Sequence, residues 1–245
     1  MNVRGLTRSM PPRWKRAYRR YLSPILRDEY YRDYRDRRAF FRKACAALAF
    51  NGIAGGYAEF GCCGGVTFDL AHRYFKKYGA EPHMWAFDSF QGLPSPSAPE
   101  DAHPLWTAGT MSMSRLEFQR ACKQRGIPAD CYTIIEGYFD RSLAAPESDG
   151  FSQDICLAYI DCDLYSSTKT VLQFLEKRLK HGVILGFDDY YCWSATQASG
   201  ERKACAEFFA NHPQWILVPF YRFGMGGMSF VVEARALGAA TGAGY

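Results

Sequence analysis

The sequence has no run of about 18 apolar residues, which excludes a conventional membrane-spanning helix. It also lacks low-complexity tracts and internal repeats, so fibrous and solenoid architectures are excluded. None of its nine cysteines are spaced as C-x-x-C, and a structural zinc site is therefore not expected. The first residues show no apolar stretch of the kind found in secretory signals, so we expect a cytoplasmic protein with reduced cysteines.

The length and composition fit one large folded unit. The chain has 245 residues, of which 48% are hydrophobic, and this is enough to bury a single core. We predict three parts, namely a basic helical extension over residues 1–50, a main domain over 51–235 and a flexible tail over 236–245. A second full domain is not expected.

Positive charge is concentrated at the N-terminus. Residues 1–43 hold 14 Lys and Arg against 4 Asp and Glu, whereas the remainder of the chain is net acidic. Trp14, Tyr18 and Tyr21 recur at helical spacing, which favours a helix whose aromatic stripe packs on the body or on a second subunit. We therefore expect a homo-oligomer. A basic, aromatic segment also fits an anionic membrane surface, which stays an alternative, or a nucleic acid, which we do not expect.

Hydrophobic patterns alternate between strands and helices along the chain. Strands are expected at 57–60, 83–87, 131–135, 155–160 and 183–187, with helices over 24–50, 66–78, 114–126 and 167–179. Two further apolar runs, 215–220 and 228–233, are joined by a short glycine-rich stretch. The pattern predicts an α/β fold with a doubly wound, mostly parallel seven-stranded sheet, helices on both faces and an antiparallel C-terminal hairpin.

Polar residues follow the first two predicted strands, at the sheet edge where open parallel sheets bind ligands. The glycine cluster after Glu59 allows a tight turn and a close backbone approach to a ligand, although a purely structural turn gives the same pattern. Asp88 ends the second strand, where an acid in this fold accepts hydrogen bonds from a ribose; a turn cap with Ser89 is the alternative. A nucleoside cofactor is favoured. The absence of the dinucleotide fingerprint G-x-G-x-x-G points to S-adenosylmethionine.

Four carboxylates follow the next pair of neighbouring strands. Asp161 and Asp163 come after the fourth strand, and Asp188 and Asp189 come after the fifth. At adjoining strand ends they repel one another unless a cation joins them. Hard oxygen ligands suit Mg²⁺ or Mn²⁺. Surface caps, or ion pairs with Lys and Arg, are the alternative interpretation.

Five stretches resemble the macrocin O-methyltransferase family of metal-dependent sugar methyltransferases. They are residues 58–65 (AEFGCCGG), 87–94 (FDSFQGLP), 136–139 (EGYF), 161–166 (DCDLYS) and 187–190 (FDDY). The resemblance implies a class I methyltransferase that uses S-adenosylmethionine to methylate a hydroxyl of a sugar or glycosylated small molecule. RNA ribose, a phenolic acceptor, a metal-independent methyltransferase of the same fold and a cofactor-binding protein without turnover stay as alternatives.

The same resemblance implies roles for individual residues. Asp88 holds the ribose, the glycine turn borders the methionine part, and Tyr138 lies near the adenine. The full set implied to contact the cofactor is Glu59, Gly61, Gly65, Asp88, Ser89, Gly137 and Tyr138.

The implied magnesium ligands are Asp161, Asp188 and Asp189. Catechol-type enzymes place a lysine three residues beyond the first aspartate, but here that position is Leu164. The catalytic candidates are therefore Asp161 at the metal, with Asp163 and His212 as candidate bases. The Pro- and Ser-rich segment 92–110, which contains Trp106, is predicted to close over the acceptor as a lid.

Overall fold

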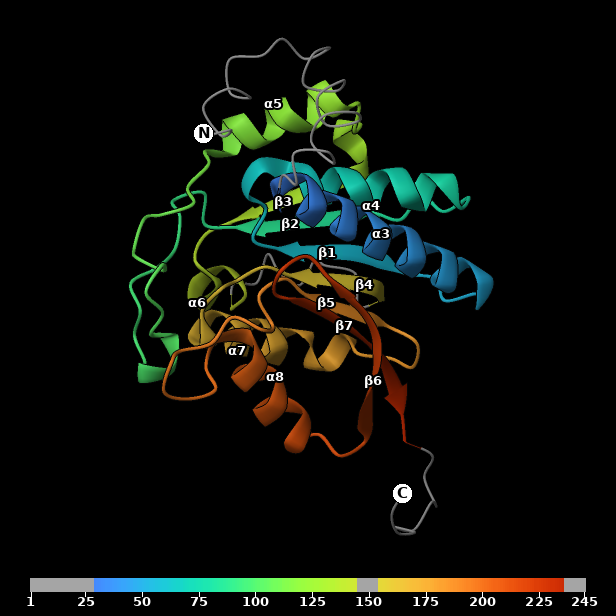
Figure 1. Cartoon of the computed structure of the whole chain (residues 1–245). Coiled ribbons are helices and arrows are strands. Elements are labelled where there is room, and N and C mark those ends of the chain that lie inside the picture. The colour runs from blue at the N-terminus through green and yellow to red at the C-terminus, as the bar shows by residue number, and fades with distance from the viewer. Residues whose placement is uncertain (1–28, 145–153, 236–245) are drawn as a thin grey trace.

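A computed structural model describes residues 29–144 and 154–235, and these form one seven-stranded sheet with helices on both faces (Figure 1). The strand order is β3-β2-β1-β4-β5-β7-β6. The first five strands run parallel, while β7 pairs antiparallel with both β5 and β6. The strands are β1 (Gly56–Phe60), β2 (Met84–Asp88), β3 (Tyr132–Glu136), β4 (Ile155–Ile160), β5 (Ile184–Phe187), β6 (Trp215–Phe223) and β7 (Gly227–Ala234). The predicted fold class and C-terminal hairpin are confirmed.

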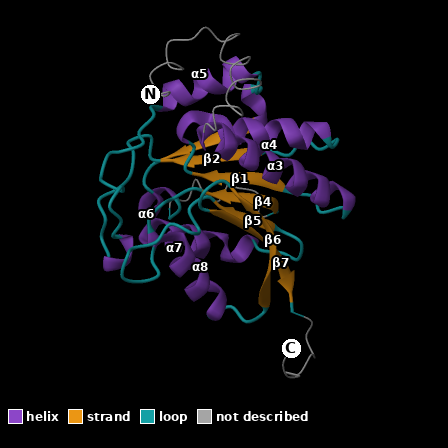
Figure 2. Cartoon of the chain, in the orientation of Figure 1, coloured by secondary structure: helices purple, strands orange, loops and turns teal. Residues whose placement is uncertain are grey.

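Helices cover the sheet in two layers (Figure 2). One layer holds α3 (Glu29–Phe50), α4 (Val66–Lys77) and α5 (Arg115–Arg125), and the other holds α6 (Phe139–Ser142), α7 (Tyr165–Leu175) and α8 (Gly200–Ala210). Of these, α6 and α8 have no counterpart among the elements predicted from the sequence. No helix in the described ranges has the length and apolarity needed to cross a bilayer.

The strand residues alternate between the two layers. Tyr57 and Tyr159 point into the core under α3 and α4, whereas Ala58 and Ile160 point into the core under α7 and α8. Because both faces are covered, all six residues of β4 are buried, which explains why this strand is apolar throughout.

The helix α3 contributes to the same core as the sheet. Phe40 and Phe41 are fully buried, and the ring of Phe40 stacks on Phe223 of β6 with their centroids 4.5 Å apart. The aromatic residues Trp14, Tyr18 and Tyr21 and the predicted tail 236–245 lie outside the described residues.

Candidate active site

A cavity of about 760 Å³ opens at the carboxyl ends of the five parallel strands β1 to β5. Its wall includes residues from all five stretches singled out in the sequence, together with further residues of the loop that follows β2 and one residue of α3. The predicted site residues that line it are Gly61, Asp88, Ser89, Gly137, Tyr138, Asp161, Asp163, Asp188 and Asp189. The structure therefore brings these polar residues together at one edge of the sheet, as the sequence predicts.

The turn after β1 depends on glycine. Gly61 has φ of +89°, and a Cβ placed there would lie 1.9 Å from the carbonyl oxygen of Asp161. Its amide donates to the carbonyl of Phe87 over 2.8 Å, which ties the end of β1 to β2. Only glycine permits both the backbone conformation and the close approach to β4.

Two residues predicted to contact the cofactor do not line the cavity. Glu59 is fully buried, and its carboxylate accepts hydrogen bonds from the Tyr57 hydroxyl and, over 2.8 Å, from the Thr67 hydroxyl. Burial raises the pKa of Glu59 to about 8. Gly65 precedes α4 and faces the ring of Phe118. Both residues lie behind the turn and not on the cavity wall, and the cofactor contact implied for them stays a prediction.

Asp88 caps the turn, which is one of the two roles considered from the sequence, and its ribose contact stays a prediction. It lines the cavity, and its carboxylate also accepts hydrogen bonds from the amides of Cys62 (2.6 Å) and Phe90 (2.7 Å). Its burial raises the pKa of the carboxyl group. The Ser89 hydroxyl donates to the carbonyl of Gly92 over 2.9 Å, which closes the turn that starts the next loop.

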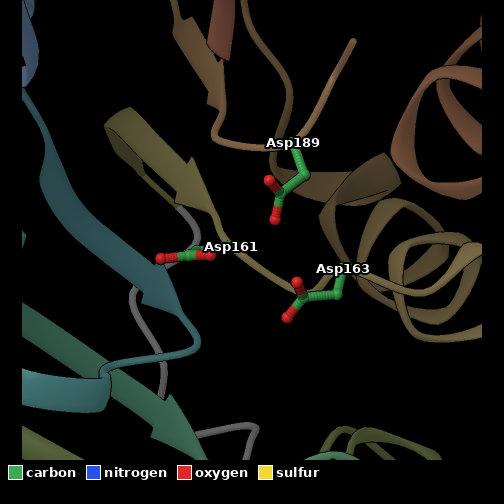
Figure 3. A group of neighbouring side chains, drawn as sticks. All are labelled: Asp161, Asp163 and Asp189. Carbon is green, nitrogen blue, oxygen red and sulfur yellow. The ribbon is translucent and has the colours of Figure 1, made fainter. Parts of the chain in front are cut away.

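Asp161, Asp163 and Asp189 form a compact acidic group. One carboxylate oxygen from each lies within 4.8 Å of the other two, and the three side chains point toward a common space between the ends of β4 and β5 (Figure 3). Asp163 has φ of +59°, and this left-handed backbone conformation aims its side chain back toward Asp161. We call these three residues the acidic triad.

Burial and mutual repulsion shift the pKa values of the acidic triad. Burial first, and then repulsion from neighbouring carboxylates, raises the pKa of Asp161 well above its usual range, that of Asp163 to about 9, and that of Asp189 as well. A divalent cation removes the repulsion by neutralising the charges. Three hard oxygen donors in reach of one point are the donor set that Mg²⁺ and Mn²⁺ take, so the residues fit such an ion.

Asp188, which the resemblance implies as a metal ligand, is bound by an arginine in this structure. Both of its oxygens accept hydrogen bonds from the guanidinium of Arg37, over 2.8 and 2.5 Å, and one also accepts from the Tyr159 hydroxyl. Asp188 lines the cavity but is not part of the acidic triad, in which Asp163 takes its place. Arg37 lies 151 residues away on α3, so no local sequence pattern pointed to it.

His212 is not brought to the site. It follows α8, where its Nδ1 lies 2.6 Å from the Phe208 carbonyl and its Nε2 lies 3.1 Å from Glu176. Its ring stacks on Phe208 with the centroids 4.0 Å apart, and it does not line the cavity. The proposal of His212 as a base is therefore wrong, because the end of α8 packs away from the strand ends.

The loop between β2 and α5 forms one wall of the cavity and runs toward α7 and α8 (Figure 1). Asp101 is fully buried in it and accepts hydrogen bonds from the amides of Ser97 (2.9 Å) and Ala98 (3.1 Å) and, at the start of α7, Ser166 (2.8 Å). Trp106 lines the cavity and is 8% exposed. The loop is thus anchored at its middle, with Trp106 on its inner side.

Comparisons with known proteins agree with this geometry. The family model described as Macrocin-O-methyltransferase (TylF) matches residues 34–212. No curated protein sequence matches the chain.

Solved structures share the fold. The O-methyltransferase NovP has a TM-score of 0.68 at 20% identity, covering 82% of this chain and 80% of its own. The calicheamicin methyltransferase CalS11 has a TM-score of 0.69 at 17% identity, covering 94% and 89%. An O-methyltransferase from Bacillus cereus in complex with SAH has a TM-score of 0.50 at 12% identity, covering 79% and 80%. Because the family model covers well over half of the chain, this protein belongs to the macrocin-O-methyltransferase family and is an O-methyltransferase.

Proposed function

We propose that the chain transfers a methyl group from S-adenosylmethionine to a hydroxyl of a sugar or glycosylated small molecule, with help from Mg²⁺ or Mn²⁺. The observation that carries the proposal is that Asp88, Gly137 and the acidic triad line one cavity. A methyl donor bound at Asp88 and Gly137 and an acceptor bound at the acidic triad would therefore lie in the same cavity.

The donor half of the cavity is formed by the turns after β1, β2 and β3. Asp88 offers carboxylate oxygens to ribose hydroxyls, and Gly61 offers a backbone without a side chain in the way. Gly137 and Tyr138 offer a flat surface for the adenine. When bound, S-adenosylmethionine supplies an electrophilic methyl group on a sulfonium. The SAH in the related Bacillus cereus structure supports this choice of donor.

The acidic triad would hold the metal ion. When bound, Mg²⁺ lowers the pKa of the acceptor hydroxyl that it contacts. The residues of the chain contribute position, since an in-line displacement requires the acceptor oxygen, methyl carbon and sulfur to be aligned. Asp163 is the candidate that accepts the hydroxyl proton, because its carboxylate lies in the cavity beside Asp161 and Asp189.

The acceptor half is formed by the loop after β2 and the start of α7. Trp106 provides an apolar ring, and serine and threonine residues line the same cavity. Sugars bind to such mixtures of an aromatic face and small polar groups. The related CalS11 is described as a TDP-rhamnose 3'-O-methyltransferase, which favours a sugar over RNA or a phenol. The cavity-lining hydroxyls of this half belong to Ser95, Ser97, Thr110, Ser166, Ser167 and Thr170.

An acceptor screen with methyl-labelled S-adenosylmethionine tests the proposal. Nucleotide sugars, glycosylated small molecules, RNA and catechols are offered with Mg²⁺ or with EDTA. We expect label on a sugar hydroxyl, and its loss with EDTA. Transfer to RNA or catechol alone would refute the acceptor class, and full activity in EDTA would refute the metal.

A further inference from the structure

Glu201 joins the two strand ends that carry the acidic triad. It lies in the first turn of α8 and is fully buried. Its Oε1 accepts a hydrogen bond from the Cys162 amide over 3.0 Å, and its Oε2 accepts one from the Asp189 amide over 3.0 Å. One carboxylate therefore binds the backbone after β4 and the backbone after β5 at the same time.

The two amides belong to the acidic triad's own backbone. Cys162 separates Asp161 from Asp163, and the other amide is that of Asp189 itself. The Leu164 amide donates to the Cys162 carbonyl over 2.6 Å, which folds Asp163 into a tight turn with φ of +59°. A left-handed conformation costs a non-glycine residue about 1 to 2 kcal/mol, and it persists where surrounding contacts fix it.

The first turn of α8 also lies against the acceptor loop. A Cβ at Gly200 would lie 3.2 Å from the Asp163 carbonyl oxygen and 3.4 Å from the Trp106 ring. The Lys203 ammonium pairs with Glu100 of that loop over 2.9 Å. The turn that carries Glu201 is thus packed between the acidic triad and the loop.

We propose that Glu201 is a positioning residue for methyl transfer, which sets the spacing and direction of the three triad carboxylates through the Cys162 and Asp189 amides. The expected effect on kcat rests on the proposed function. Its structural part, the clamp on two amides, is measurable without substrate.

Three variants separate this role from general folding. Glu201→Gln keeps the shape but replaces one acceptor oxygen with an NH₂ group, which cannot accept a hydrogen bond from the facing amide. Glu201→Asp keeps the carboxylate on a shorter stem. Glu207→Gln is the matched control, because Glu207 is on the same helix, is exposed, and bonds to the Tyr165 hydroxyl instead.

Three measurements are made on the full chain: amide hydrogen exchange of peptides covering 160–165 and 187–190, Mn²⁺ affinity by calorimetry, and kcat with the KM for S-adenosylmethionine. For Glu201→Gln we expect faster exchange in both peptides, Mn²⁺ binding weaker by about tenfold or more, and kcat lower by about 10- to 100-fold. The KM for S-adenosylmethionine should stay within about twofold, since Glu201 does not line the cavity. Glu201→Asp should recover part of kcat, and Glu207→Gln should match the wild type.

Unchanged exchange and unchanged kcat in Glu201→Gln would overturn the inference. So would an equal loss in kcat and in the affinity for S-adenosylmethionine, which indicates general disruption. If Glu201→Gln does not fold, the same outcomes are read from Glu201→Asp. A wild type that does not bind Mn²⁺ refutes the metal in the proposed function, and hydrogen exchange and kcat then decide the role of Glu201.

Discussion

Arg37 on α3 holds Asp188 at the end of β5 through two parallel hydrogen bonds, across 151 residues of sequence. The side chains are 23% and 6% exposed, so the pair is largely removed from water. The Asp188 carbonyl lies next to the β6–β7 turn at Gly226, and Arg37 also pairs with Asp33 of its own helix. The pair therefore links α3 to the site and gives Asp188 a partner other than a metal ion.

Replacing Arg37 with Met should lower the free energy of unfolding by about 2 to 4 kcal/mol, because it leaves the Asp188 carboxylate buried without its cation. Urea unfolding measures this. The double variant with Asp188→Asn should lose less than the sum of the two single losses, since both remove the same interaction. Additive losses would show that the pair contributes nothing as a pair.

Asp189→Asn and Asp188→Asn distinguish the acidic triad from the metal ligands that the sequence implies, which include Asp188 in place of Asp163. We expect Asp189→Asn to weaken Mn²⁺ binding by about tenfold or more, because it removes a charged ligand. Asp188→Asn should weaken it less than Asp189→Asn does, because Arg37 already binds that carboxylate. Calorimetry on both proteins gives the comparison. A larger loss with Asp188→Asn than with Asp189→Asn would restore Asp188 as a ligand.

Trp106→Ala should lower kcat/KM for the acceptor by about tenfold, equivalent to about 1.4 kcal/mol of transition-state stabilisation. The reason is that Trp106 lines the acceptor half of the cavity and stacks on His103 at a centroid distance of 4.0 Å. Steady-state kinetics with the acceptor varied measures the change. Trp106→Phe keeps an aromatic ring and should lose less. Wild-type kinetics in Trp106→Ala would remove the lid hypothesis.

Glu59→Gln should reduce the pH dependence of stability. The pKa of Glu59 in the folded protein is about 8, against an ordinary value of 4.5. Between these values the unfolded chain has released the proton that the folded protein keeps, so this group makes stability fall as pH rises. Relative to Glu59→Gln, the wild type should lose about 3 kcal/mol between about pH 5 and pH 8. Urea unfolding of both proteins at both pH values tests this. An equal change in the free energy of unfolding of the wild type and of Glu59→Gln would contradict it.

Much of the fold follows from local sequence patterns. The glycine turn after Phe60, the capping box formed by Ser114 and Glu117, and the apolar strand 155–160 are all where the pattern predicts them. Such features depend on the backbone preferences and burial of neighbouring residues, which the sequence carries directly. The helix α8 was not predicted.

The sequence by itself determined the sheet class, the family and the edge at which the acids gather, because strand ends of a parallel sheet meet at one edge whatever the side chains do. Only the tertiary structure decided which acids face one another. Arg37 binds the Asp188 carboxylate, and the left-handed backbone conformation of Asp163 places its side chain in the acidic triad. Glu201 accepts hydrogen bonds from the backbone after β4 and after β5. The physical reason is that these pairings are set by the packing of α3 and α8 against the sheet, over separations that no local pattern encodes.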